Sequence, residues 1–196
     1  MSSSAIYRYF PSREELLTEL IIRAYNSLGG RAESAYEAHA DGPSGATFRA
    51  VWRAVRRWAL EHRHEYALIY GSPVPGYRAP EATIGPASRL PNVLLRILAD
   101  QATHPGDARP AIVLPPVWAD PARAALLPLR SGLPAPLDNL PLDLTLAITS
   151  WATLLGAISL ELWGHLHNVV DEDLAARAAF YDAQIELMIA LLGLET

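Results

Sequence analysis

The sequence predicts an all-α fold, arranged as one helical domain or as one domain with a small appendage in a chain of 196 residues. Apolar residues recur at helical spacing in several segments. Capping residues and clusters of proline and glycine separate those segments, and no segment shows a convincing strand alternation. Hydrophobic residues make up 51% of the chain, enough for a sizeable core, and the absence of cysteine excludes disulfides and thiolate metal sites.

The first elements are a short helix over residues 2–9 and a longer one that begins at a capping motif. The short helix stops before Pro11, because the residue that precedes a proline avoids helical geometry. Ser12 then caps a new helix, and Glu15 completes a capping box with it. Apolar residues follow at helical spacing as far as Leu28. The pair Gly29-Gly30 either ends this helix or lies within a longer one.

The middle of the chain alternates helices with breaks that no helix can cross. After "DGPSG" at 41–45 we expect helices over 44–62 and 65–70, and "GSPVPGYRAP" ends the second. Another helix is expected over 86–103. A proline-punctuated loop, a short helix at 121–129 and a second proline-rich loop then lead to residue 141.

The last two helices, over 142–168 and from "DEDL" to 192, have more apolar surface than one small domain can cover. The first is apolar nearly all round, and the second has a seam spaced like a coiled coil. We therefore expect a homodimer that pairs these helices in a four-helix bundle, although helices 86–103 and 121–129 could cover them within one chain. The expected interface residues are Ala152, Gly156, Ser159, Trp163, Leu174, Ala178, Tyr181, Ile185, Met188 and Leu192.

One segment resembles a membrane span, but its sequence favours a core helix. Residues 144–160 carry no charge and fall just short of the length that a bilayer requires. Asp143 and Glu161 bracket the segment, and serine and threonine hydroxyls lie inside it. The first residues of the chain do not resemble a signal peptide. We expect a cytoplasmic protein with no membrane partner.

Two motifs far apart in the chain resemble one family. "SSSAIYRYFPSREELL" resembles the second half of the helix-turn-helix in TetR-family transcriptional regulators, with the match carried by Tyr7, Tyr9, Phe10, Pro11-Ser12, Arg13 and Leu16. "WATLLGAISLELWGHL", from Trp151, looks like the penultimate helix of the subgroup with a WHG-type C-terminal domain, as does "YALIYGSPVPGY" at 66–77. Leu155 stands where that subgroup has histidine, which favours a more apolar ligand.

The resemblance implies a partial DNA-binding domain over 1–28 and a ligand-binding and dimerisation domain over 29–196. Small polar residues at the start of a recognition helix let its backbone approach the major groove, and arginine and tyrosine side chains reach phosphates or base edges. The expected contacts to DNA are Ser2, Ser3, Ser4, Tyr7, Arg8, Tyr9 and Arg13. The family places two helices before this point, so we expect a truncated chain that binds operator DNA poorly.

The function implied is that of a ligand-responsive regulator, most simply a repressor, which dimerises on double-stranded operator DNA and binds a small apolar effector. Pockets of helical bundles are mostly apolar. The candidate wall residues are Trp52, Trp58, Tyr66, Tyr70, Trp118, Trp151 and His165, each of which could instead be a core aromatic. The alternative is a stand-alone helical dimer that binds a small molecule or a protein and never contacts DNA.

An enzyme is the least favoured class. His62 and His64 lie between two glutamates, and Glu161, His165 and His167 form a second group, but neither contains the H-E-x-x-H pattern of a zinc protease. Histidines two apart on a helix point to different faces. No glycine-rich phosphate loop and no G-x-S-x-G motif is found in the sequence. We therefore expect no catalytic activity, no metal and no cofactor.

Overall fold

The computed structural model describes residues 11–103 and 140–196, and every regular element within these two ranges is helical. The expected all-α fold is therefore confirmed. The helix expected over 2–9, the loops after residue 103 and the helix expected at 121–129 lie outside the described residues.

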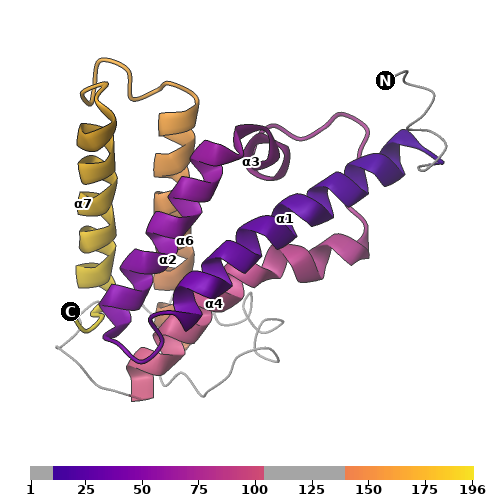
Figure 1. Ribbon diagram of the computed structural model, residues 1–196. Helices are drawn as coiled ribbons and strands as arrows, with labels where there is room; N and C mark the ends of the chain where they lie inside the picture. The colour runs from indigo at the N-terminus through magenta and orange to yellow at the C-terminus, as the bar shows by residue number, and fades with distance from the viewer. Residues whose placement is uncertain (1–10, 104–139) are drawn as a thin grey trace.

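The helices form two groups that meet at α2 (Figure 1). The C-terminal helices α6 and α7 run side by side in opposite directions, and the long helices α1 and α4 form the other group. Helix α2 contacts members of both groups. The elements are α1 (Arg13–Glu37), α2 (Ser44–Glu61), α3 (Arg63–Tyr70), the 3-10 turn η2 (Glu81–Thr83), α4 (Ile84–Thr103), α6 (Leu140–Leu162) and α7 (Leu174–Leu192).

Helix α1 begins where the capping motif predicts and continues through both glycines. The Ser12 hydroxyl accepts a hydrogen bond from the backbone N–H of Glu15 at 3.1 Å. Gly29 is buried against α4, and a Cβ atom there would lie 2.6 Å from the Cβ of Arg89. Gly29 therefore allows α1 and α4 to approach closely instead of ending α1. The expected domain boundary at residue 28 falls inside this unbroken helix.

The core is built around α2. Phe48, Val51, Trp52, Val55 and Trp58 are almost fully buried along this helix, with apolar residues of α1, α4, α6 and α7 packed against them. Burial of each such side chain stabilises the fold by about 1.5–3 kcal/mol relative to exposure. The helix expected over 44–62 is therefore the central helix of the described core.

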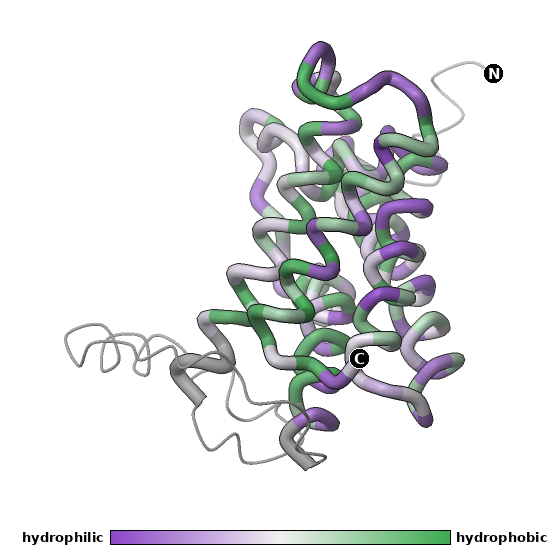
Figure 2. Tube along the Cα trace, turned by 90° about the vertical axis from the view of Figure 1, so that its left-hand side faces the viewer, coloured by the Kyte–Doolittle hydropathy of each residue, from purple (hydrophilic) through white to green (hydrophobic). Residues whose placement is uncertain are grey.

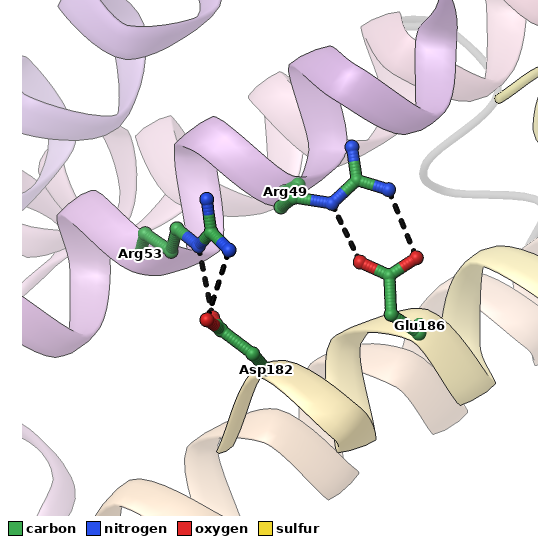
Figure 3. A network of polar contacts seen from close by, with 4 residues as sticks. All are labelled: Arg49, Arg53, Asp182 and Glu186. Carbon is green, nitrogen blue, oxygen red and sulfur yellow. Dashed lines mark hydrogen bonds and ion pairs between the residues drawn. The ribbon is translucent and has the colours of Figure 1, made fainter. Parts of the chain in front are cut away.

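Ion pairs join the polar flank of α2 to the C-terminal helices. Arg49 and Arg53 each donate two hydrogen bonds to one carboxylate of α7, Glu186 and Asp182 respectively, at N···O distances between 2.5 and 2.9 Å (Figure 3). These four side chains are partly exposed to solvent, so each pair contributes little to stability. Their spacing along α2 and α7 nevertheless fixes the register of the two helices.

Helix α6 ends at Leu162, six residues before the end expected at 168, because Gly164 stops it. Gly164 has φ +78°, the N–H of His165 donates to Leu160 O at 2.9 Å, and the N–H of Gly164 donates to Glu161 O at 3.3 Å. This hydrogen-bond pattern is a Schellman C-cap, which glycine adopts without strain. Gly193, at φ +62°, ends α7 in the same way.

The seam expected to join two copies instead faces the inside of one chain. Tyr181, Ile185 and Leu192 are no more than 2% exposed and belong to the core with α2, so the prediction that they contact a partner is wrong. The reason is that α2 supplies the apolar partner that sequence spacing alone could not locate. Among the other expected interface residues, Gly156, Ser159, Ala178 and Met188 are half-buried, whereas Ala152, Trp163 and Leu174 are exposed.

A different apolar face of the same two helices is open to solvent. Figure 2 looks onto this side of the molecule, where hydrophobic residues recur along the helices. The exposed large side chains of this face are Ile148, Leu160 and Trp163 of α6 and its end, and Phe180 and Leu187 of α7. We call this set the α6–α7 outer face. On α7, Phe180 and Leu187 lie in one row with Gln184 and Leu191, next to the buried seam of Tyr181, Ile185 and Leu192.

One helix of the described ranges is long and apolar enough to cross a membrane by length and composition. It is the window Thr145–Leu162 of α6, and half of that window is buried inside the protein. A core helix of a soluble protein meets the same criteria, so this window is weak evidence for a span.

Candidate effector pocket and DNA-contact segment

A largely apolar cavity lies between α1, the end of α3, the following loop, α4 and α6. Its volume is about 710 Å³, within the range typical of small-molecule sites. The loop over residues 71–79 forms one wall, and Ile21 and Tyr25 of α1 form another. The remaining lining comes from Leu68, Ile69, Thr83, Ile84, Ala87, Ser88, Pro91, Asn92, Leu94, Leu95, Ala147, Ile148 and Trp151. We call this space the α1–α4–α6 cavity.

The polar groups of this cavity are mostly engaged within the protein. The Thr83 hydroxyl donates to Pro80 O at 2.7 Å, and the Ser88 hydroxyl donates to Ile84 O at 2.8 Å. The Tyr25 hydroxyl makes a longer hydrogen bond, 3.4 Å, to Ile69 O. The surface that the cavity offers to a ligand is therefore dominated by carbon.

A cluster of aromatic rings supports the cavity between α1, α3 and α6. The rings of Tyr25 and Tyr70 meet edge to face at 6.1 Å between centroids, and Tyr66 lies 5.2 Å from Tyr70. The Tyr66 hydroxyl donates to Leu155 O at 2.9 Å, which ties α3 to α6. Burial raises the pKa of the Tyr70 hydroxyl, and the neighbouring tyrosines raise it further, so Tyr70 is neutral at physiological pH.

Trp151 links this cluster to the cavity lining. Its Nε1 is buried away from solvent. The interaction of Trp151 with the Tyr70 hydroxyl lowers the pKa of that group, against the larger effect of burial. Because Nε1 is hidden, Trp151 presents ring carbon to the cavity.

The pocket prediction is partly corrected by the structure. Trp151 lines the cavity, and Tyr70 lies in the cluster next to it. Trp52, Trp58 and Tyr66 are at most 1% exposed and belong to the core. Burial of such large rings in the core removes the most apolar surface from water. His165 lies exposed in the turn after α6, away from the lining, and Trp118 is outside the described residues.

Sequence reasoning missed the walls that α1, α4 and the 71–79 loop supply. In the sequence, Ile21 and Tyr25 belong to the apolar spacing of their helix, and the loop is a helix break within a segment that resembles the WHG-type subgroup, with no residue of it expected in the pocket. The loop sequence "GSPVPGY" carried the available signal, because its prolines and Tyr77 are the apolar content of an otherwise short connection.

One hydrogen bond connects the cavity wall to the N-terminal part of α1. The hydroxyls of Tyr77 and Thr18 lie 2.9 Å apart, and Thr18 also donates to Glu14 O at 2.9 Å. Tyr77 lines the cavity, whereas Thr18 lies within two turns of the start of α1. The cavity is therefore built directly on the helix that follows the expected DNA-contact residues.

Arg13 is the one expected DNA-contact residue that the structure describes. It is exposed and occupies the first position of α1, directly after the capping residue Ser12. Backbone N–H groups at a helix N-terminus and an arginine beside them suit a phosphate contact. Ser2, Ser3, Ser4, Tyr7, Arg8 and Tyr9 lie outside the described residues.

Three members of the histidine and glutamate groups of the sequence, Glu161, His167 and His62, make contacts within the protein. Glu161 is 8% exposed and forms a bidentate ion pair with Arg56. His167 pairs with Glu172, and His62 stacks on Trp58 with 5.2 Å between ring centroids. Within residues 11–103 and 140–196, no group of three or more His, Asp or Glu side chains is arranged to hold a metal ion.

A second cavity, of about 560 Å³, lies at the other end of α1 and is more polar. The Tyr36 hydroxyl donates to Asp100 at 2.5 Å there, and the Ser44 hydroxyl bonds to Gln101. The backbone N–H of Glu195 donates to Ser44 Oγ and Gln101 Oε1, each at 3.0 Å. These contacts tie the C-terminal residues to α2 and α4, so the polar groups serve the fold.

The family described as "Tetracyclin repressor-like, C-terminal domain" matches residues 48–188, which include α3, α4 and α6 and most of α2 and α7. This chain belongs to the TetR family. The match covers more than half of the chain and every wall of the α1–α4–α6 cavity except that of α1.

Several known proteins are similar to this TetR-family chain over nearly its whole length. It is 36% identical over 195 residues to the HTH-type transcriptional regulators Mb1846 of Mycobacterium bovis and Rv1816 of Mycobacterium tuberculosis, covering 98% of this chain and 79% of each relative. Among solved structures, SCO4313 is 30% identical with a TM-score of 0.69, over 96% of this chain and 79% of that one. The chain is thus a TetR-like transcriptional regulator, similar to proteins that are named as transcriptional regulators.

A more distant solved structure supports the fold alone. A protein of unknown function from Rhodococcus sp. RHA1 is 22% identical with a TM-score of 0.60, and the match covers 100% of the TetR-family chain and 80% of that protein.

Proposed function

We propose that this chain is a ligand-responsive repressor that acts in the cytoplasm as a homodimer on operator DNA. Its effector site is the α1–α4–α6 cavity, and its DNA contacts come from residues 2–9 together with Arg13. The observation that carries the proposal is that α1 forms a wall of the cavity and begins directly after the DNA-contact residues.

The proposed coupling runs through α1. A ligand in the cavity contacts Ile21 and Tyr25 and displaces the 71–79 loop, whose Tyr77 bonds to Thr18. A change in the tilt of α1 alters the separation of the two DNA-contact segments in a dimer, which must match one helical turn of DNA, about 34–36 Å. Ligand and DNA then weaken each other's binding by the same factor.

The proposed dimer buries the α6–α7 outer face. Phe180 and Leu187 are 41% and 64% exposed, and Ile148 and Leu160 are about as exposed on the adjacent helix. Small neighbours such as Ala152 and Ala183 are also exposed and allow helices to approach. Two copies related by a two-fold axis would cover this face as a four-helix bundle.

The test of DNA binding begins with selection of duplexes from a random library by the 196-residue chain. We expect enrichment of a two-fold symmetric site whose affinity is modest and falls steeply as salt is raised. Arg13→Gln should weaken binding by severalfold, whereas Arg23→Gln, exposed on α1 and about 15 Å further along the helix, should not. Failure to enrich any duplex would favour the DNA-independent module instead.

The test of ligand response uses the selected duplex. Compounds that raise the melting temperature of the protein are added to the protein–duplex complex, and release is followed by fluorescence anisotropy. We expect at least one compound that binds in the cavity to lower duplex affinity. Binding in the cavity with no change in duplex affinity would contradict the proposed coupling through α1.

A further inference from the structure

The lining of the α1–α4–α6 cavity consists of neutral side chains in the part of the chain that the structure describes. Among its described residues, none carries a charged side chain. The hydroxyls of Tyr77, Thr83 and Ser88 are engaged within the protein. Tyr25 makes only a long hydrogen bond, and the exposed side chains of Ser72 and Asn92 add a hydroxyl and an amide. The cavity therefore offers a few neutral hydrogen-bonding groups on a surface that is otherwise apolar.

The arginines closest in sequence to the cavity walls form ion pairs or hydrogen bonds within the protein, or are exposed to solvent. Arg89, on the cavity helix α4, donates two hydrogen bonds to Glu33 and one to the side chain of Asn26, which directs it toward α1 and away from the lining. Arg23 of α1 pairs with Glu19 at 2.7 Å. Arg78, which adjoins Tyr77 in sequence, is exposed. Within residues 11–103 and 145–196, no charged side chain lines the cavity to act as the counter-ion of a bound ligand.

From this inventory we infer that the cavity takes an uncharged, largely apolar molecule with few hydrogen-bonding groups and rejects ionic molecules of the same size. The inference rests on the proposed function for the cavity as effector site, and it adds the chemical class of the effector. An ion that entered would lose its hydration without gaining a counter-ion, which costs far more than the transfer of a neutral hydroxyl.

The test compares ligands that differ only in charge. The neutral dye Nile red reports occupancy by its fluorescence, and 1-decanol, decanoate and decylammonium compete for it at pH 7.4. We expect decanol to displace the dye at a concentration at least about tenfold lower than either ion, because only the ions require a counter-charge. An ion that competes as well as the alcohol, or a dye that none of the three displaces, overturns the inference.

A charged residue introduced into the cavity wall tests whether the ligands bind in this cavity. Ala87 lines the cavity from α4 and is half-buried, so Ala87→Arg places a cation at the ligand and should improve decanoate binding relative to decanol by about tenfold or more. Ala87→Glu should do the same for decylammonium. Ser34→Arg and Ser34→Glu, on the exposed side of α1, are the matched controls. Circular dichroism checks that each variant is folded.

The outcomes separate this inference from the proposed function. If the Ala87 variants leave the order of the three ligands unchanged, ligands bind elsewhere and the inference is overturned. If the order changes as expected while duplex affinity stays constant, the ligand class is correct and the regulatory proposal is contradicted. None of the dye measurements depends on DNA.

Discussion

The guanidinium of Arg56 and the carboxylate of Glu161 form a bidentate ion pair, with N···O distances of 2.8 and 2.6 Å. Their side chains are only 14% and 6% exposed, so this is the most buried pair among those found in the described residues. Arg56 also lies over the ring of Tyr181, 5.6 Å from its centroid. One arginine thus joins α2 to both C-terminal helices.

Removal of one partner of this pair should be costly. Glu161→Leu leaves the Arg56 charge buried without its counter-ion, and we expect the free energy of unfolding to fall by about 3–5 kcal/mol. The double variant Arg56→Met/Glu161→Leu should recover most of that loss, because it removes both charges. Urea denaturation measures both effects. A double variant as unstable as the single one would show that packing, and not charge, determines the loss.

Acid should weaken the contact between α2 and α7. The hydrogen bonds from Arg49 hold the pKa of Glu186 below its ordinary value of 4.5. Because the folded-state pKa is the lower one, the stabilisation is fully present above the unfolded value and is lost as the pH falls through the folded value. Both groups are partly exposed, so the contribution is less than about 1 kcal/mol. Glu186→Gln should flatten the pH dependence of the urea midpoint below pH 4.5.

The two adjacent glycines of α1 should respond in opposite directions to alanine. At Gly29 a Cβ atom would meet the Cβ of Arg89 at 2.6 Å, and we expect Gly29→Ala to destabilise the protein by about 1–3 kcal/mol through overpacking. At Gly30 the nearest atom is the end of the Arg89 side chain at 3.7 Å. Gly30→Ala should therefore stabilise by about 0.4–1 kcal/mol. Equal effects in thermal unfolding would contradict the close approach of α1 and α4.

The hydrogen bond between Tyr77 and Thr18 should affect coupling more than ligand affinity. Tyr77→Phe retains the ring that lines the cavity and removes the hydroxyl, so we expect Nile red affinity to change by less than about 1 kcal/mol. Ligand should then protect the first turns of α1 less from hydrogen exchange than in the parent protein. Tyr25→Phe, which loses only the longer bond to Ile69 O, is the control. Unchanged protection in Tyr77→Phe would exclude this hydrogen bond from the coupling.

The α6–α7 outer face should determine the oligomeric state. Leu187→Arg places a charge at the centre of its α7 portion and should convert a dimer to a monomer in light scattering at micromolar concentration. Val169→Arg is the control, because Val169 is 75% exposed but lies in the turn between the helices. A parent protein that is already monomeric at this concentration would rule out the proposed dimer.

Local signals in the sequence predict the helices well. Ser12 and Glu15 define the start of α1 through a hydrogen bond between neighbours in sequence. Leu90, Leu94, Ile97 and Leu98 are buried along α4, as their spacing predicts. The end of α6 expected at residue 168 is wrong, because helical spacing of apolar residues does not reveal the backbone conformation with which Gly164 caps the helix.

The partners of the helix faces depend on long-range packing and could not be predicted in the same way. The spacing of Tyr181, Ile185 and Leu192 identified an apolar seam correctly, but the same seam fits another chain or α2 equally well. The large aromatics Trp52 and Trp58 likewise suit a core and a pocket. The cavity lies instead where elements distant in sequence, α1, α4 and the 71–79 loop, fail to fill the space between them.

Gly29 has a mechanical consequence for α1 as a whole. The close contact with Arg89 makes that position a fulcrum, with the cavity residues Ile21 and Tyr25 on one arm and Arg13 at its tip. At 1.5 Å per residue the arm from Gly29 to Arg13 is about 24 Å long, roughly two to three times the distance from the fulcrum to the cavity. A push of half an ångström at the cavity side therefore becomes about an ångström at the tip. An unbroken helix that pivots at a glycine would therefore enlarge small movements inside the protein at the end that carries the proposed DNA contact, Arg13.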